Sequence, residues 1–378
     1  MTRAPLSVLD LVPVVSGQGP SDALRNSIDL AREAERLGYA RYWVAEHHLN
    51  PGVAGTDPAV VIALLAGATS TIRVGSGAVL LGHRTALSTI EEFGLLDAAF
   101  PGRIDLGLGR SGGKPPTSAQ ADVPPVPLVD GRTVEGLLVP PKASIEHLLA
   151  SPRFKLQREL LQLAGAQSAE YGEQVDDILA FIAGTYRSRD GVPAQVIPGE
   201  GAELQLWVLG SSGGESAQVA GKRGLRFATN YHVNPSGVIE AALAYRAAFE
   251  PSAGPSGLTA PHVAVSADVV VADDEATARE LATGYGVWVR SIRTAEGAIP
   301  FPTPEQARAW RWTDADRALV RDRIDTQFVG TATQVADHLE VLQRAVGADE
   351  LVVTTITHDH ADRVRSYELL AQEWARRS

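Results

Sequence analysis

The chain has 378 residues, of which 44% are hydrophobic, and it carries a formal net charge of −11 with no cysteine. This composition allows a large buried core, and the negative charge argues against a general affinity for nucleic acid or anionic lipid, because both require basic surfaces. We find no thiolate metal site, no signal-peptide pattern and no apolar run of membrane-spanning length, so we expect a cytoplasmic protein that binds a small molecule and no nucleic acid or membrane.

Short β-branched runs alternate with helical patterns over the first 110 residues. Strands are predicted over 6–14, 41–47, 72–81 and 103–109. Helices are predicted between them over about 21–37, 57–69 and 86–99. The first helix begins at the capping residue Ser21 and ends at Gly38, and the second has Pro58 in its first turn.

The same alternation returns in the second half of the chain. Strands are predicted over 204–210, 226–233, 262–272 and 350–356. The helices between them run through Gly224, near 235–249, from Asp273, and from a capping box formed by Thr331 and Gln334, and a last helix follows the final strand. Eight strands separated by helices predict an α/β fold of the (β/α)8 TIM-barrel type, with residues 1–378 as one domain.

Two segments do not follow the repeat. Residues 114–165 are rich in proline and polar residues, and residues 284–326 contain aromatics, arginine and proline. In a barrel they would be insertions after strands 4 and 7, on the face where active sites are built, so we expect either lids or insertions without a role in the site.

Gly107, Gly109 and Gly112 have the G-x-G-x-x-G spacing of a dinucleotide-binding loop. A Rossmann unit requires a helix directly after the third glycine and an acidic residue about twenty positions on. Here "KPPTSAQADVPP" follows, and consecutive prolines prevent such a helix. We therefore interpret "RIDLGLG" as the fourth barrel strand, ending in a glycine-rich turn with Arg110 at its tip, where it would clamp a phosphate or pair with a carboxylate.

Glu46, His47 and His48 form the most reactive cluster of the sequence, at the end of the second strand. Alternation along a strand places Glu46 and His48 on one side and His47 on the other. General acid/base chemistry, metal binding and structural hydrogen bonding all remain open for this cluster.

Smaller groups of residues follow the other strands. Those expected to line a cofactor or phosphate site are Ser76, Gly77 and Ala78 after the third strand, and Ser211, Ser212, Gly213 and Gly214 before a helix. Tight packing explains the first group equally well, and an ordinary helix cap explains the second. Asn230 and His232 follow the sixth strand and would line the site or bond within a loop.

The sequence resembles the bacterial luciferase-like family of flavin-dependent monooxygenases. The matching stretches are "LAREAERLGYARYWVAEHH", "VGSGAVLLGHRTAL", "EEFGLLDAAFPGRIDLGLGR", and "LWVLGSS" with "AGKRGLRFATN". The resemblance implies a luciferase-type barrel that binds reduced FMN, or in sister branches the deazaflavin F420, at the carboxyl ends of the strands.

The resemblance also assigns roles to particular residues. His47 matches the active-site histidine of the E-H-H motif, and Arg110 with residues 211–214 matches the phosphate-binding positions. The bond between Gly77 and Ala78 matches a non-prolyl cis peptide. The proline-rich insertion and the glycine-rich "GSSGGES" depart from the family pattern.

The expected function is therefore an FMN-dependent monooxygenase that uses O₂ on a small organic substrate, with reduced FMN supplied by a separate flavin reductase. The catalytic residues would be His47 and Glu46, and no metal is expected. An F420-dependent hydride-transferring oxidoreductase and a non-catalytic flavin-binding protein are the alternatives. A metal-dependent hydrolase using Glu46, His47, His48 and His232 is disfavoured, because barrel hydrolases spread their ligands over several strands. Family relatives are often dimers, so we expect a homo-oligomer.

Overall fold

A computed structural model of the chain describes residues 3–110, 131–143, 148 and 150–377. Eight parallel strands close into a barrel, in which each strand pairs with the next along the chain and the last pairs with the first. These are β1 (Leu6–Asp10), β2 (Arg41–Val44), β3 (Arg73–Ser76), β5 (Ile104–Gly109), β8 (Gln205–Leu209), β9 (Arg226–Asn230), β10 (Val263–Val271) and β12 (Glu350–Thr354). The (β/α)8 barrel is confirmed, and each predicted strand overlaps one of these elements.

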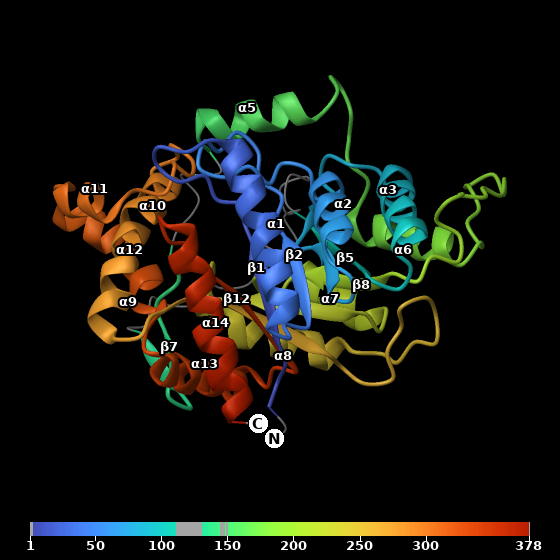
Figure 1. The fold of residues 1–378 in the computed structure, drawn as a ribbon. Helices are drawn as coiled ribbons and strands as arrows, with labels where there is room; N and C mark the ends of the chain where they lie inside the picture. The colour runs from blue at the N-terminus through green and yellow to red at the C-terminus, as the bar shows by residue number, and fades with distance from the viewer. Residues whose placement is uncertain (1–2, 111–130, 144–147, 149, 378) are drawn as a thin grey trace.

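Helices surround the barrel (Figure 1). They are α1 (Pro20–Arg36), α2 (Pro58–Ala68), α3 (Ala86–Ala99), α6 (Tyr171–Ile182), α7 (Glu215–Lys222), α8 (Val238–Ala248), α9 (Glu275–Leu281), α13 (Ala332–Val346) and α14 (His360–Arg376). Gly38, Gly224 and Gly347 follow three of these helices with φ of +80°, +61° and +68°, the left-handed conformation that favours glycine at a helix end. Among the described residues, none of the helices is both long and apolar enough to cross a bilayer.

Several predicted strands end earlier than expected: the one over 6–14 ends at Asp10 and the one over 226–233 ends at Asn230. Two further changes affect the site. The strand predicted over 72–81 is interrupted at Gly77–Ala78, whose peptide bond is cis as the resemblance implied, and it continues as the short strand β4 (Val79–Leu80). The strand predicted over 41–47 ends at Val44, so Glu46, His47 and His48 lie in the loop that follows β2.

Further elements lie within the two predicted insertions. The first contains a hairpin of β6 (Arg132–Val134) and β7 (Leu137–Val139) and the helix α5 (Pro152–Leu161), whereas residues 114–130, 144–147 and 149 lie outside the described part of the chain. The second contains α10 (Thr283–Arg293), α11 (Pro304–Ala309) and α12 (Asp314–Asp325), followed by β11 (Phe328–Gly330), which extends the sheet beside the end of β10.

The barrel interior is built in layers. At the amino-terminal ends of the strands, Asp105 accepts hydrogen bonds of 2.6 Å from Arg41 Nη1 and 2.7 Å from Arg73 Nε, and Arg41 Nε also donates to Glu350 at 2.6 Å. The next layer is apolar, with Trp43 as one of its large members.

Glycines complete this apolar layer on the β3–β5 side. Trp43 and Trp207 meet edge to face with ring centroids 4.9 Å apart. A Cβ at Gly107 would lie 2.1 Å from the carbonyl oxygen of Ser76. The first glycine of the G-x-G pattern therefore serves close packing of barrel strands, and Gly112 lies outside the described residues.

Candidate active site

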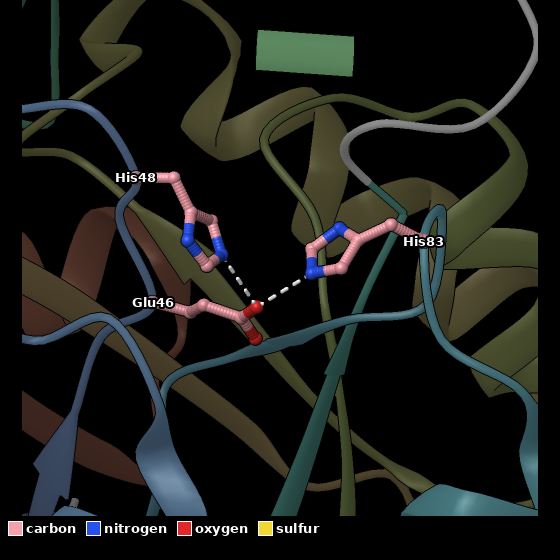
Figure 2. A group of neighbouring side chains, drawn as sticks. All are labelled: Glu46, His48 and His83. Atoms are coloured by element: carbon pink, nitrogen blue, oxygen red, sulfur yellow. Dashed lines mark hydrogen bonds and ion pairs between the residues drawn. The ribbon is translucent and has the colours of Figure 1, made fainter. Parts of the chain in front are cut away.

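The carboxylate of Glu46 is the centre of a hydrogen-bonded cluster that joins the loops after β2 and β4 (Figure 2). Its Oε1 lies 2.9 Å from His48 Nε2 and 2.8 Å from His83 Nε2, and its Oε2 accepts a 2.9 Å hydrogen bond from the backbone N–H of Leu80. Burial alone would raise the pKa of Glu46, but the two imidazoles, the backbone N–H and the charge of Arg84 together lower it to about 2. Glu46 is therefore a carboxylate at neutral pH.

His83 and Arg84 are members of this cluster that the sequence analysis did not select. Both belong to "GHRTAL", which the resemblance included, and the signal was a histidine and an arginine directly after a barrel strand. The guanidinium of Arg84 lies 3.5 Å from Glu46 Oε1 and also pairs with Glu92 at 2.8 Å. Glu46 thus holds two loops together at the mouth of the barrel.

The same cluster offers donor atoms for a metal ion. One carboxylate oxygen and two imidazole nitrogens all lie within 4.8 Å of one another, from Glu46, His48 and His83, and Zn²⁺ accepts such a set. Both imidazoles already face the carboxylate at hydrogen-bonding distances, and Arg84 places a positive charge beside it. A cation would have to displace these hydrogen bonds against that charge, and the hydrogen-bonded state satisfies the carboxylate without one.

His47 is separate from this cluster. Trp43 and Ala45 face the barrel interior, and His47 follows them, half-buried, in the loop after β2. Burial, and next the charge of His48, lower the pKa of His47 to about 4 although Glu46 acts in the opposite direction. Its Nδ1 is buried and has no hydrogen-bond partner among the described residues. Buried polar atoms are seldom left unpaired, so this neutral imidazole is free to hydrogen-bond a ligand.

His232 lies after β9 and is close enough to His47 for their charges to interact. Its Nδ1 lies 2.7 Å from Ser266 Oγ on β10. Burial comes first among the causes that lower the pKa of His232 to about 3, followed by the charges of Arg323 and His47. The sequence analysis selected His232 but not Ser266 or Arg323, which join it only through the fold.

The small residues after β3 form part of the barrel wall. Ser76 has no exposed surface, and its hydroxyl both donates to the carbonyl of Gly107 at 3.0 Å and accepts from its N–H at 2.9 Å. This corrects the assignment of Ser76 to cofactor binding: its hydroxyl ties β3 to β5 and has no surface left for a ligand.

Gly77 and Ala78 follow Ser76. A Cβ at Gly77 would lie 2.9 Å from Leu9 Cδ1 and 3.3 Å from Trp43. Packing against the apolar layer therefore requires glycine at position 77, and its half-buried backbone reaches the mouth of the barrel.

Arg110 and the residues 211–214 meet at the neighbouring strands β5 and β8. Arg110 Nη1 donates to Glu215 Oε2 at 2.9 Å, and its side chain remains 40% exposed. Helix α7 begins after Gly214 without a side-chain cap, so its first backbone N–H groups remain available to an anion. The structure thus places both predicted phosphate-binding elements side by side.

Two further residues border this helix end. The side-chain amide of Asn234 donates to the carbonyl of Ser211 at 2.6 Å and holds the loop. The predicted lining residue Asn230 instead caps the turn after β9, where its Oδ1 accepts from the backbone N–H of Asn234 at 3.2 Å.

A parallel barrel with neutral imidazoles and an uncapped helix end at the carboxyl ends of its strands has the arrangement of an α/β-barrel enzyme. The chain belongs to the luciferase-like monooxygenase family, whose model matches residues 6–135 and 164–350. It is an oxidoreductase of the monooxygenase class.

Full-length relatives agree with this assignment. The chain is 35% identical over 373 residues to the uncharacterized protein YvbT of Bacillus subtilis, covering 98% of this chain and 97% of YvbT. It is 33% identical over 364 residues to a luciferase-like monooxygenase of Escherichia coli, covering 96% of this chain and 95% of that relative. The crystal structure of apo-MsnO8 superimposes with a TM-score of 0.76 at 32% identity, covering 99% and 98%.

More distant structures share the fold and differ in cofactor. The oxygenating constituent of 3,6-diketocamphane monooxygenase from Pseudomonas putida, in complex with FMN, gives a TM-score of 0.65 at 18% identity and covers 99% of each chain. An F420-dependent secondary alcohol dehydrogenase gives a TM-score of 0.59 at 14% identity, and the match covers 98% of each chain. The fold alone therefore leaves both cofactors open.

Proposed function

We propose that this protein is an FMN-dependent monooxygenase that uses reduced FMN and O₂ to oxygenate a small organic substrate. One observation carries the proposal: His47 presents a half-buried, neutral imidazole at the mouth of the barrel, and its buried Nδ1 has no partner among the described residues. Most buried polar atoms are hydrogen-bonded, and a ligand at the mouth of the barrel would supply the partner of this one.

The residues around His47 fit the proposed cofactor. Arg110 and the uncapped start of α7 would hold the phosphate of FMN. The backbone at Gly77 and Ala78 would lie beside the flavin ring, since no side chain projects from position 77. Bound reduced FMN would supply the electrons that activate O₂.

The chain's own residues would then control protons and water. A neutral His47 has one ring nitrogen that accepts a proton and one that donates, so it can transfer a proton at the reacting atoms near pH 7. Tyr285 and Trp288 of α10 pack with the apolar interior of the barrel and would exclude water on the side of β10. Glu46 would act through position, by fixing the loops on both sides of His47.

We also propose two partners. A separate reductase would supply reduced FMN, because we recognise no nicotinamide-nucleotide site in the sequence. A second copy of the chain would cover the apolar side chains exposed on α2 and α3, namely Val60, Leu64, Leu87 and Leu95; light scattering measures the mass of the assembly.

The deciding experiment is anaerobic titration of the purified chain with reduced FMN and, separately, with reduced F420, followed by mixing with oxygenated buffer. Tight binding of reduced FMN and a slowed, substrate-dependent reaction with O₂ are expected. Tight binding of F420 without a reaction toward O₂ would instead establish hydride transfer, the second candidate, which the F420-dependent fold relatives favour. Binding of FMN with no coupled product from any substrate would leave a non-catalytic flavin-binding protein.

A further inference from the structure

Asp268, Tyr285 and Arg323 form a buried polar group on the β10 side of the barrel mouth. Asp268 comes from β10, Tyr285 from α10 and Arg323 from α12. The Tyr285 hydroxyl donates to Asp268 Oδ2 and accepts from Arg323 Nη2 at 2.8 Å and Nε at 3.2 Å. The predicted second insertion thus contributes buried side chains to the mouth.

The charge of Arg323 is only partly neutralised in this group. The closest approach of its guanidinium to Asp268 Oδ2 is 3.4 Å, through Nη2, and the Tyr285 hydroxyl takes the two shorter hydrogen bonds. Nη1 makes no hydrogen bond with any described residue, although the side chain is only 9% exposed. Nη1 is not one of the buried polar atoms without a partner, so it retains surface that a ligand can reach.

His232 adds a second donor beside Arg323. Ser266 Oγ lies 2.7 Å from His232 Nδ1 and can donate to it or accept from it. An anion at Nε2 would stabilise the tautomer in which the hydroxyl donates to Nδ1 and Nε2 carries the imidazole proton. Nε2 has no partner within the described ranges. Ser266 and Asp268 lie two positions apart on β10 and therefore face the same side, which brings His232 and Arg323 together. The charge of Arg323 also lowers the pKa of His232.

We propose that Arg323 and His232 bind a negatively charged oxygen group, a carboxylate or a sulfonate, of the organic substrate. This rests on the proposed function, because it names the substrate class of the same site. Arg323 supplies the charge and the free Nη1 donors, and His232 supplies a neutral N–H. Asp268 and Tyr285 are positioning residues, because they contact Nε and Nη2 of the guanidinium and leave Nη1 for the anion.

The test measures binding without flavin, so its outcome is independent of the FMN titration. Butanoate, hexanoate, octanoate and hexanesulfonate are titrated into the purified chain by calorimetry, with hexan-1-ol as the uncharged control. We expect saturable binding of at least one anion and at least tenfold weaker binding of the alcohol.

Variants then locate the bound anion. Arg323→Met and His232→Gln should each weaken its binding, Arg323→Met by at least tenfold. Arg321→Met, on the same helix and 80% exposed, is the matched control and should leave the affinity unchanged. Because Arg323→Met leaves the buried Asp268 without a positively charged partner and risks misfolding, Asp268→Asn provides a second measurement: removal of the opposing charge should strengthen anion binding several-fold.

Four results would overturn the proposal. Two concern the ligands: equal binding of hexanoate and hexan-1-ol, or no binding of any anion. Two concern the variants: unchanged affinity in both His232→Gln and Asp268→Asn, or loss of binding in Arg110→Met but in no other variant, which would place the anion at the proposed phosphate site. NMR titration adds a readout that a structural role would not move, since a bound anion should raise the pKa of His232.

Discussion

The two ends of the barrel handle buried polar groups in opposite ways. At the amino-terminal end, Arg41, Arg73, Asp105 and Glu350 pair with one another at 2.6–2.7 Å. At the carboxyl end, His47 and His232 are half-buried, neutral imidazoles, and the buried Nδ1 of His47 is left without a partner among the described residues. At the amino-terminal end the polar groups bond one another, whereas at the carboxyl end hydrogen-bonding atoms remain available for a ligand. Mutations at the two ends should therefore separate stability from activity.

The largest effect on folding is expected from Asp105→Ala. The substitution leaves Arg41 and Arg73 without their shared carboxylate and removes the acceptor of the Trp43 indole N–H. Breaking such a buried group should lower the free energy of unfolding by about 3–5 kcal/mol, measured by urea denaturation. Asp325→Ala removes the exposed partner of Arg321 and should cost less than about 1 kcal/mol. Similar losses of unfolding free energy in Asp105→Ala and Asp325→Ala would mean that the buried charged group does not stabilise the barrel.

His47→Ala should have the converse effect. Loss of the proton-transferring imidazole should reduce coupled product formation by at least about a hundredfold, while the free energy of unfolding stays unchanged or rises, because a buried unpaired atom is removed. Turnover with reduced FMN and urea denaturation are measured on the same preparation. Unchanged turnover would exclude a role for His47 in the chemistry.

Acid should lower the free energy of unfolding through His47, at the carboxyl end of the barrel. The pKa of His47 is about 4 in the folded chain against an ordinary 6.5, so the unfolded chain binds more protons between these values and stability is lost as the pH falls from about 6.5 toward 4. For this one group the loss is on the order of 2 to 3 kcal/mol at pH 4.5.

The matched variant is His47→Gln. Its free energy of unfolding should depend less on pH than that of the wild type between about pH 6.5 and 4. Above pH 7 the two proteins should show the same dependence of this free energy on pH. Parallel urea curves at pH 7, 5.5 and 4.5 measure it. If the variant and the wild type lose stability equally, His47 is not buried as a neutral group.

The smallest effect concerns the proposed phosphate site. Glu215→Gln removes the carboxylate that pairs with the part-exposed Arg110 and should strengthen FMN binding about two- to fivefold, whereas Arg110→Met should weaken it about tenfold. Riboflavin lacks the phosphate, so its affinity should not change in either variant. A parallel change for riboflavin would mean that these residues do not contact the phosphate.

Much of the candidate site was predictable because its residues follow strands directly. Glu46, His47, Arg110, Ser211 and His232 were selected from their positions at strand ends, and parallel strands bring such positions to one face. The contacts place Glu46 with His48 and leave His47 apart, although all three lie in the loop after β2 rather than in a strand. The helix α6 and the helices of the second insertion were not predicted, although α6 carries Val175, Ile178 and Ile182 at helical spacing.

The sequence by itself determined the barrel, because β-branched strands, amphipathic helices and glycine helix ends are local signals that repeat along the chain. Only the tertiary structure decided which polar groups are satisfied. His83 reaches Glu46 across 37 positions, and Arg323 reaches Asp268 across 55. Ser76 was assigned to a ligand until the fold placed its hydroxyl against Gly107. Hydrogen bonds and desolvation depend on distances between segments remote in sequence, and those distances exist only once the barrel has closed.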